Sequence, residues 1–118
     1  MQVLKIGIMP QHRFQKRLLD IAAGRYVPKR GEPKIWFSSI KSFSEVLSDN
    51  NVRLLRLIER YQPDSLKELA ELSGRKTSNL NRTLKTMARY GIVELKKVNK
   101  TVRPIAKATE FNIQYAAI

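Results

Sequence analysis

The sequence contains no cysteine and a single histidine, His12. A chain without cysteine forms neither a disulfide nor a thiolate metal site, and this composition fits a reducing compartment, so we expect a cytoplasmic protein. His12 has no Ser-His-Asp or Cys-His partners, and the few acidic residues lack the spacing of paired carboxylates or metal ligands. A glycine-rich phosphate loop is also missing. We therefore expect no enzymatic activity, no metal site and no cofactor.

Long apolar runs are absent as well. No stretch approaches the roughly 18 apolar residues that would span a bilayer. The apolar stretch within residues 1–11 is too short for a signal peptide. The 118 residues are 42% hydrophobic, which is enough to bury a core without cross-links. We expect an N-terminal strand–helix extension over residues 1–38, with a dimerising or accessory role, and a main domain over residues 39–118.

Positive charge is abundant and unevenly distributed. The formal net charge is +13, of which residues 74–107 supply +9 through ten basic side chains and one acidic one. Residues 1–31 carry +6, residues 32–73 carry −1, and residues 108–118 carry −1. A concentrated positive field attracts polyanions, and nucleic acid is the usual partner. A membrane surface and a merely solvated basic face are the alternatives.

Apolar periodicity predicts alternating short elements in the first half of the chain. Alternation favours a strand over residues 1–8, and helical spacing favours a helix over 11–25. A basic loop rich in proline and glycine follows at 26–34, and a short strand is expected at 34–37. Trp36 and Phe37 within it are expected to fill the core or an interface rather than to stack on bases.

Two further helices are expected before the most informative segment. Ile40, Phe43 and Leu47 mark a brief amphipathic helix, and residues 50–61 carry a wide apolar stripe that requires burial. Ser48 or Asp49 is expected to separate the two helices and to cap the second.

Residues 63–91 specify two helices and a tight turn. Ser65 and Glu68 have the spacing of a capping box, in which the serine oxygen accepts from the backbone N–H of Glu68 and the glutamate reaches back to that of Ser65. Gly74 is placed to end this helix with a positive φ. The next helix is expected to start with Thr77 or Ser78 as its cap and to end at Gly91.

The second of these helices has two chemically different sides. Leu80, Leu84 and Met87 line one side at helical spacing, and the other side presents amides and cations. Two helices joined by about four residues, the second with a polar and basic outer face, are typical of a helix-turn-helix that reads the DNA major groove. The alternative is an ordinary solvated surface helix. The candidate base-reading residues are Ser78, Asn79, Asn81, Arg82 and Lys85.

A hairpin is expected after this helix. Residues 93–96 alternate, a turn falls at 99–101, and apolar residues recur at even spacing from Ile105 to Tyr115, which predicts two antiparallel strands. Lysines and Arg103 cluster about the turn, where they would contact the sugar-phosphate backbone, although such a hairpin can also be a protected sheet edge. The candidate backbone-contacting residues of helix and hairpin are Arg75, Lys76, Thr77, Arg89, Lys96, Lys97, Lys100 and Arg103.

These motifs resemble a known group of regulators. Residues 66–70, 78–84 and 87–93 are similar to the winged-helix core of bacterial multiple-antibiotic-resistance-type and arsenic-type regulators, and the resemblance covers residues 50–114. It implies a winged helix-turn-helix, so that the expected fold class is α+β, mostly α, with the N-terminal extension added. Metal sensing of the arsenic type is not expected without cysteine. Trp36 to Ser39 and Arg103-Pro104 resemble small regulators encoded beside toxin genes, which implies an autoregulatory antitoxin with a toxin partner.

The sequence thus predicts a homodimeric, sequence-specific repressor that binds double-stranded DNA. The extra strand and helix are expected to build the dimer interface, or else to contact flanking DNA or an acidic partner with their basic residues. Two alternatives remain open: a basic winged-helix protein that binds RNA or the ribosome, and an interaction module whose main partner is a toxin.

Overall fold

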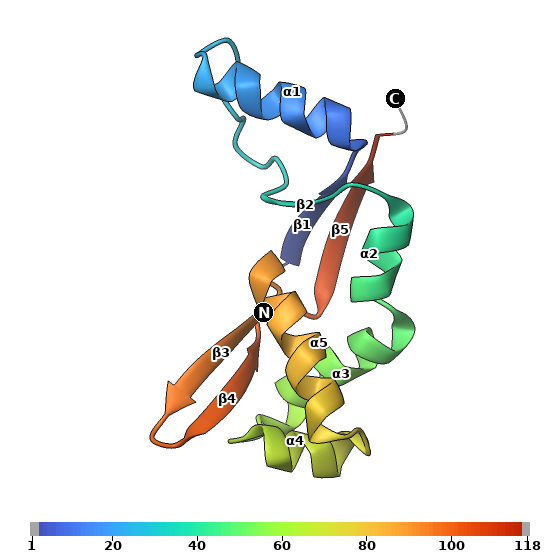
Figure 1. Ribbon diagram of the computed structural model, residues 1–118, viewed down its shortest axis with the longest axis vertical. Coiled ribbons are helices and arrows are strands. Elements are labelled where there is room, and N and C mark those ends of the chain that lie inside the picture. The colour runs from blue at the N-terminus through green and yellow to red at the C-terminus, as the bar shows by residue number, and fades with distance from the viewer. Residues whose placement is uncertain (1–2, 117–118) are drawn as a thin grey trace.

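A computed structural model, which describes residues 3–116, has an α+β fold with about half of its residues in helices (Figure 1). The molecule is elongated, with principal extents of 48 × 28 × 24 Å. In chain order the elements within the described range are β1 (Val3–Ile8), α1 (Gln11–Ala22), β2 (Ile35–Phe37), α2 (Ile40–Val46), α3 (Asp49–Tyr61), α4 (Leu66–Ser73), α5 (Thr77–Tyr90), β3 (Val93–Val98), β4 (Thr101–Ala106) and β5 (Glu110–Tyr115). The expected α+β class and the expected positions of the five helices are confirmed.

The strands form two separate sheets. β1 lies in the middle of a three-stranded parallel sheet of order β2-β1-β5, with Ile6 paired to Ile35 on one side and to Ile113 on the other. β3 and β4 form an antiparallel hairpin whose turn holds Asn99 at a φ of 56°. In Figure 1 the parallel sheet occupies the middle of the molecule and the hairpin projects from its lower part.

The prediction of one strand running from Ile105 to Tyr115 is wrong. The chain breaks the strand at Lys107–Thr109, and β5 then leaves the hairpin to pair with β1 in the other sheet. Even spacing identifies an apolar face but carries no information about which strand will be the neighbour. As a result, the N-terminal extension expected at 1–38 is completed by a strand from the end of the chain.

The two faces of the parallel sheet are packed differently. Ile6, Ile8 and Phe37 are buried on the face toward the helical core, where the Phe37 ring stacks on Tyr90 with 4.3 Å between ring centroids. On the opposite face Gly7 lies beneath Trp36, its register partner. A Cβ on Gly7 would overlap the Trp36 ring, so glycine is strongly favoured there. Phe37 is thus a core residue, as expected, and Trp36 is half-buried.

Helix α1 contacts the Trp36 face of the sheet through a few side chains, and none of its residues is fully buried. Phe14 contacts the Trp36 ring at a centroid separation of 6.2 Å, and the Arg17 guanidinium lies 5.1 Å from the centroid of the same ring. Arg17 also donates a hydrogen bond of 2.9 Å to Glu32. These contacts fix the loop that follows α1 against the sheet.

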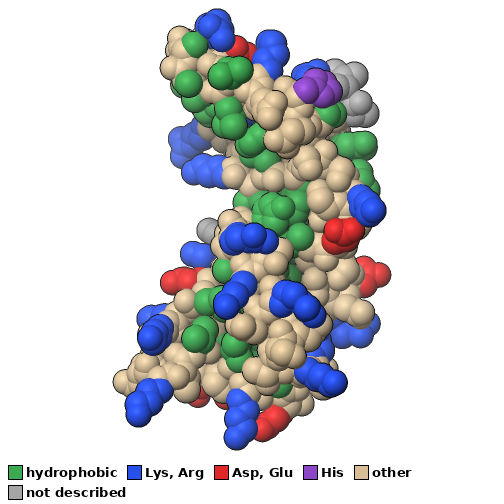
Figure 2. Space-filling model, viewed as in Figure 1, with side chains coloured by type: hydrophobic (Ala, Val, Ile, Leu, Met, Phe, Trp, Pro, Cys, Tyr) green, Lys and Arg blue, Asp and Glu red, His purple; other side chains and the backbone are tan. Residues whose placement is uncertain are grey.

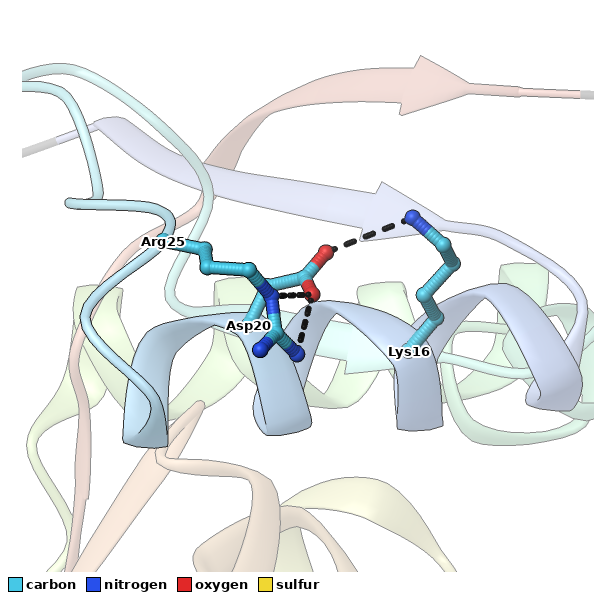
Figure 3. A network of polar contacts seen from close by, with 3 residues as sticks. All are labelled: Lys16, Asp20 and Arg25. Atoms are coloured by element: carbon cyan, nitrogen blue, oxygen red, sulfur yellow. Dashed lines mark hydrogen bonds and ion pairs between the residues drawn. The ribbon is translucent and has the colours of Figure 1, made fainter.

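The end of α1 is held by a second polar cluster, drawn in Figure 3. Asp20 accepts hydrogen bonds from Arg25 Nε at 3.0 Å and from Lys16 Nζ at 3.4 Å. Lys16 and Asp20 lie one turn apart on α1, and Arg25 reaches Asp20 from the loop that follows the helix, so the acidic residue neutralises part of the local positive charge.

Helix boundaries in the lower body follow local capping rules. Ser48 caps α3 by accepting from Asn51 N, and Ser65 caps α4 by accepting from Glu68 N at 3.1 Å. The return bond of the expected capping box is shifted by one residue, since Glu68 accepts from the N–H of Asp64 rather than Ser65. Gly74 and Gly91 end α4 and α5 with positive φ, as predicted.

Buried apolar side chains from every layer meet in one core. α5 contributes Leu80, Leu84 and Met87, all fully buried, and α3 contributes Leu54, Leu55 and Ile58. This core fixes α5 against α3 and α4, so that its opposite side faces outward. Within residues 3–116 no helix combines the length and the apolar content needed to cross a membrane.

Candidate functional site

The outer side of α5 gathers most of the polar residues singled out from the sequence. The side chains of this face line one open hollow of about 750 Å³ between α5 and the start of the hairpin. Because Leu80, Leu84 and Met87 anchor the inner side, this polar side cannot turn toward the core. The lining residues are Ser78, Asn81, Arg82, Lys85, Thr86, Ala88, Arg89 and Leu95.

Four of the five candidate base-reading residues are exposed and the fifth is half-buried. Ser78, Asn81, Arg82 and Lys85 are exposed, whereas Asn79 is half-buried and turned toward the preceding turn. Arg75 Nε donates to Asn79 Oδ1 at 2.8 Å, which occupies the amide oxygen that would otherwise accept from a base. The structure therefore places Asn79 in an internal contact rather than on the outer face.

Arg75 is the centre of this internal contact. Besides Asn79, its guanidinium donates to Asn51 Oδ1 at 3.1 Å and to Thr83 Oγ1 at 3.1 Å. The Arg75 guanidinium thus links the turn between α4 and α5 to α3 and to two successive turns of α5. Arg75 was expected on the DNA backbone, but its half-buried side chain is engaged by protein groups and serves to position α5.

The start of α5 differs from the prediction. The N-cap is Lys76, with a φ of −68° and a ψ of 144°, and no side chain closes the cap by a hydrogen bond. Neither Thr77 nor Ser78 is the cap, because the helix has already begun at Thr77. Lys76, Thr77 and Ser78 are all exposed, so the positive end of the helix dipole faces outward together with a lysine.

The hairpin cations are divided between two faces. Leu95 faces the hollow beside α5, and alternation puts Lys97 on that same face. Lys96 and its register partner Arg103 are on the other face, where Arg103 is half-buried beside Ile58 and Glu59 of α3. Lys100 is at the exposed tip. Figure 2 shows basic side chains spread over this lower half of the molecule, around α5 and the hairpin.

Sequence reasoning missed a second basic surface at the start of α3. Asn50, Asn51 and Arg53 line a hollow of about 580 Å³ together with Lys76 and Arg75 of the turn. The charges of residues 32–73 sum to −1, so the net charge of this segment gave no indication of a basic surface. The spacing of Arg53, Arg56 and Arg60 could have revealed them, because it places three exposed arginines along α3.

Several side chains of the N-terminal part have shifted pKa values. A hydrogen bond from Tyr26 and another from Arg17 lower the pKa of Glu32, and hydrogen bonds from Arg25 and Lys16 lower that of Asp20. Donating to Glu32 raises the pKa of Tyr26. These shifts arise from pairs that fasten α1 and its loop. In residues 3–116 no group of three or more metal-ligating side chains comes together, and His12 is exposed.

Comparison with known proteins matches one part of the chain. A protein-family model described as HVO_A0114 matches residues 46–113, which is more than half of the sequence. The matched part runs from the end of α2 into β5, so it includes α4, α5 and the hairpin but not β1, α1 and β2. No curated protein and no solved structure matches the chain.

Proposed function

The chain belongs to the HVO_A0114 family, and we propose that it is a transcriptional repressor that binds double-stranded DNA through a winged helix-turn-helix. One observation carries the proposal: Ser78, Asn81, Arg82, Lys85 and Arg89 share one open face of α5 beside the hairpin. A rigid helix that presents amide and guanidinium groups outward has the chemistry that reads base edges.

In this proposal α4, the turn and α5 form the helix-turn-helix, and α5 enters the major groove. Asn81 is suited to the bidentate pairing that asparagine makes with adenine, and Arg82 to the pairing that arginine makes with guanine. Lys97 and Lys100 of the hairpin contact the sugar-phosphate backbone as a wing. Lys76, which precedes α5, and Thr77 and Arg89, which lie in its first and last turns, add contacts of the same kind.

The charge distribution supports the same partner. Residues 74–107 carry +9, and they form the turn, α5 and the hairpin. Neutralising phosphates releases condensed counterions, so affinity for DNA should fall steeply with salt. Arg53 and Asn50 of α3 extend the basic surface past the turn toward a neighbouring phosphate. The helical body would thus contact the backbone on one side of α5 and the hairpin on the other.

Repression follows from occupancy. A protein of this size that covers a major groove in a promoter competes with RNA polymerase for the same DNA. We propose that the protein represses transcription by occupying promoter DNA in this way. The promoter of its own gene is the first one to examine. Neutralisation of a toxin would add a protein partner without replacing the DNA contact.

The test is selection from random duplex DNA at physiological salt, followed by footprinting and titration of the selected site. We expect a recurrent sequence, protection of one groove face, and specific binding about 10³-fold or more tighter than to unrelated duplex. Titration is repeated with structured RNA as competitor. Equal competition by RNA, or selection without any recurrent sequence, would contradict the proposal.

A further inference from the structure

Strand β5 is unusually exposed for a strand with apolar residues. In β5, Asn112, Ile113, Gln114 and Tyr115 are all exposed, with 39% of Ile113 and 60% of Tyr115 accessible. One edge of β5 pairs with β1, and within residues 3–116 no strand pairs with its other edge. Such free edges are normally protected by lysine or proline. β5 contains neither, and Glu110 is its sole charged residue.

The sequence of β5 reads chemically the same in both directions. From Phe111 to Tyr115 the order is aromatic, amide, isoleucine, amide, aromatic. An interface on a two-fold axis has to be self-complementary, because a residue i that meets residue j of the second copy requires that residue j of the first copy meets residue i of the second. An antiparallel pair centred on Ile113 would place Ile113 opposite Ile113, Phe111 opposite Tyr115, and Asn112 opposite Gln114. Every pair is then matched in chemistry and in face.

Charge also favours contact at this place. The protein carries +13, which opposes association of two copies, but residues 108–118 carry −1. β5 therefore brings no positive charge to the contact. Shape points the same way, since the radius of gyration is 16.1 Å and a compact chain of this length would have about 13–14 Å. In the monomer the three-stranded parallel sheet is therefore left with an uncovered edge at β5.

We propose that two copies of this chain pair through the free edge of β5, antiparallel, about a two-fold axis at Ile113. The two three-stranded sheets become one continuous sheet, and the exposed Ile113 and Tyr115 side chains pack across the axis. The partner is a second copy rather than another protein because the pattern from Phe111 to Tyr115 complements itself. The pairing is independent of DNA binding, and it is measured without DNA, so the failure of one proposal leaves the other standing.

A single cysteine reports this geometry, because the chain has none of its own. Antiparallel partners have Cα atoms about 4.5–5.5 Å apart, within the range of about 4.4–6.8 Å that a disulfide spans. Under mild oxidation the Ile113→Cys variant should form a covalent dimer of twice 13.6 kDa. The matched control is Leu19→Cys on α1, a position that is 66% exposed and away from β5. This variant should remain a monomer. Both variants are compared by gel electrophoresis without reducing agent.

Charge at the axis provides the second test. In Ile113→Lys or Ile113→Glu each substituted residue meets its own copy, so either variant alone should sediment as a monomer, whereas the wild type sediments as a dimer. Mixing the two should restore the dimer as a heterodimer, which a folding defect would not allow. The proposal is overturned if the wild type is monomeric, if both single variants remain dimeric, or if the mixture gives no dimer.

Discussion

Arg75 and Asn51 are 24 residues apart in the chain, and a hydrogen bond of 3.1 Å joins the Arg75 guanidinium to the Asn51 amide oxygen. The same guanidinium holds Asn79 and Thr83, so one side chain fixes the start of α5 relative to α3. The residues that would touch DNA are therefore carried by a helix whose orientation depends on a residue that does not itself face outward.

Replacing Arg75 by Ala should lower stability more than it changes surface charge. Loss of three hydrogen bonds should reduce the free energy of unfolding by about 1–3 kcal/mol, measured by urea denaturation. Arg82→Ala removes the same charge from an exposed position and should change stability by less than about 0.5 kcal/mol. Equal stability of the two variants would show that the network contributes little.

Arg82→Ala should affect DNA binding instead. We expect affinity for the selected site to fall by about 1–3 kcal/mol and base preference to relax at one position, measured by fluorescence anisotropy with matched duplexes. Arg60→Ala on α3 removes an equal charge outside the α5 face and serves as control. If both variants lose the same affinity for all sequences, Arg82 contributes only general charge.

Lys97 and Lys96 are adjacent but lie on opposite faces of the hairpin. Lys97→Ala should weaken binding to all duplexes and reduce the slope of log affinity against log salt by about 1, because one phosphate contact is lost. Lys96→Ala should leave the slope close to that of the wild type. A larger effect at Lys96 would mean that the other hairpin face meets the DNA.

Gly7→Ala should destabilise the parallel sheet. The added Cβ would overlap the Trp36 ring, and forcing extra volume into a packed contact costs about 1–3 kcal/mol. Thermal unfolding monitored by circular dichroism measures the loss, because Trp36 is the single tryptophan and fluorescence would be lost with it. In a Trp36→Ala background the same change at Gly7 should cost much less. An equal cost in both backgrounds would assign the effect to the backbone rather than to the ring.

Stability should decrease on the acid side. Glu32 and Asp20 have lowered pKa values in the folded protein, so their pairs stabilise fully above the ordinary carboxyl values of about 4. That contribution is lost as the pH falls through the lower folded values. Glu32→Gln should therefore be less stable than the wild type at neutral pH and should show a shallower acid loss. Glu71→Gln removes an exposed carboxylate of α4 and is the matched control for the change of charge, with stability measured over the same pH range.

Elements with local signals were predictable from the sequence. Ser65, Gly74 and Gly91 fix helix ends through bonds within a few residues, so α4 and α5 were placed correctly. The outward face of α5 followed from the spacing of Leu80, Leu84 and Met87, because one buried side of a helix defines the other.

Features that depend on distant partners were not predictable. β5 pairs with β1, and nothing in the sequence of residues 105–115 predicts this partner. The inward turn of Arg75 depends on Asn51, Asn79 and Thr83 coming together, and an arginine in a turn reads equally well as a solvated cation. The two faces of the hairpin required the register between β3 and β4.

The pairing of β1 with β5 also bears on how the protein is made. Val3 is opposite Glu110, so β1 gains its second neighbour only after the intervening residues, which hold α1 to α5 and the hairpin, have been synthesised. Closing so long a segment is slow compared with forming the helices. β1 therefore lacks the β5 neighbour while α3, α4 and α5 can already assemble, and we expect the three-stranded sheet to be completed after the helical core.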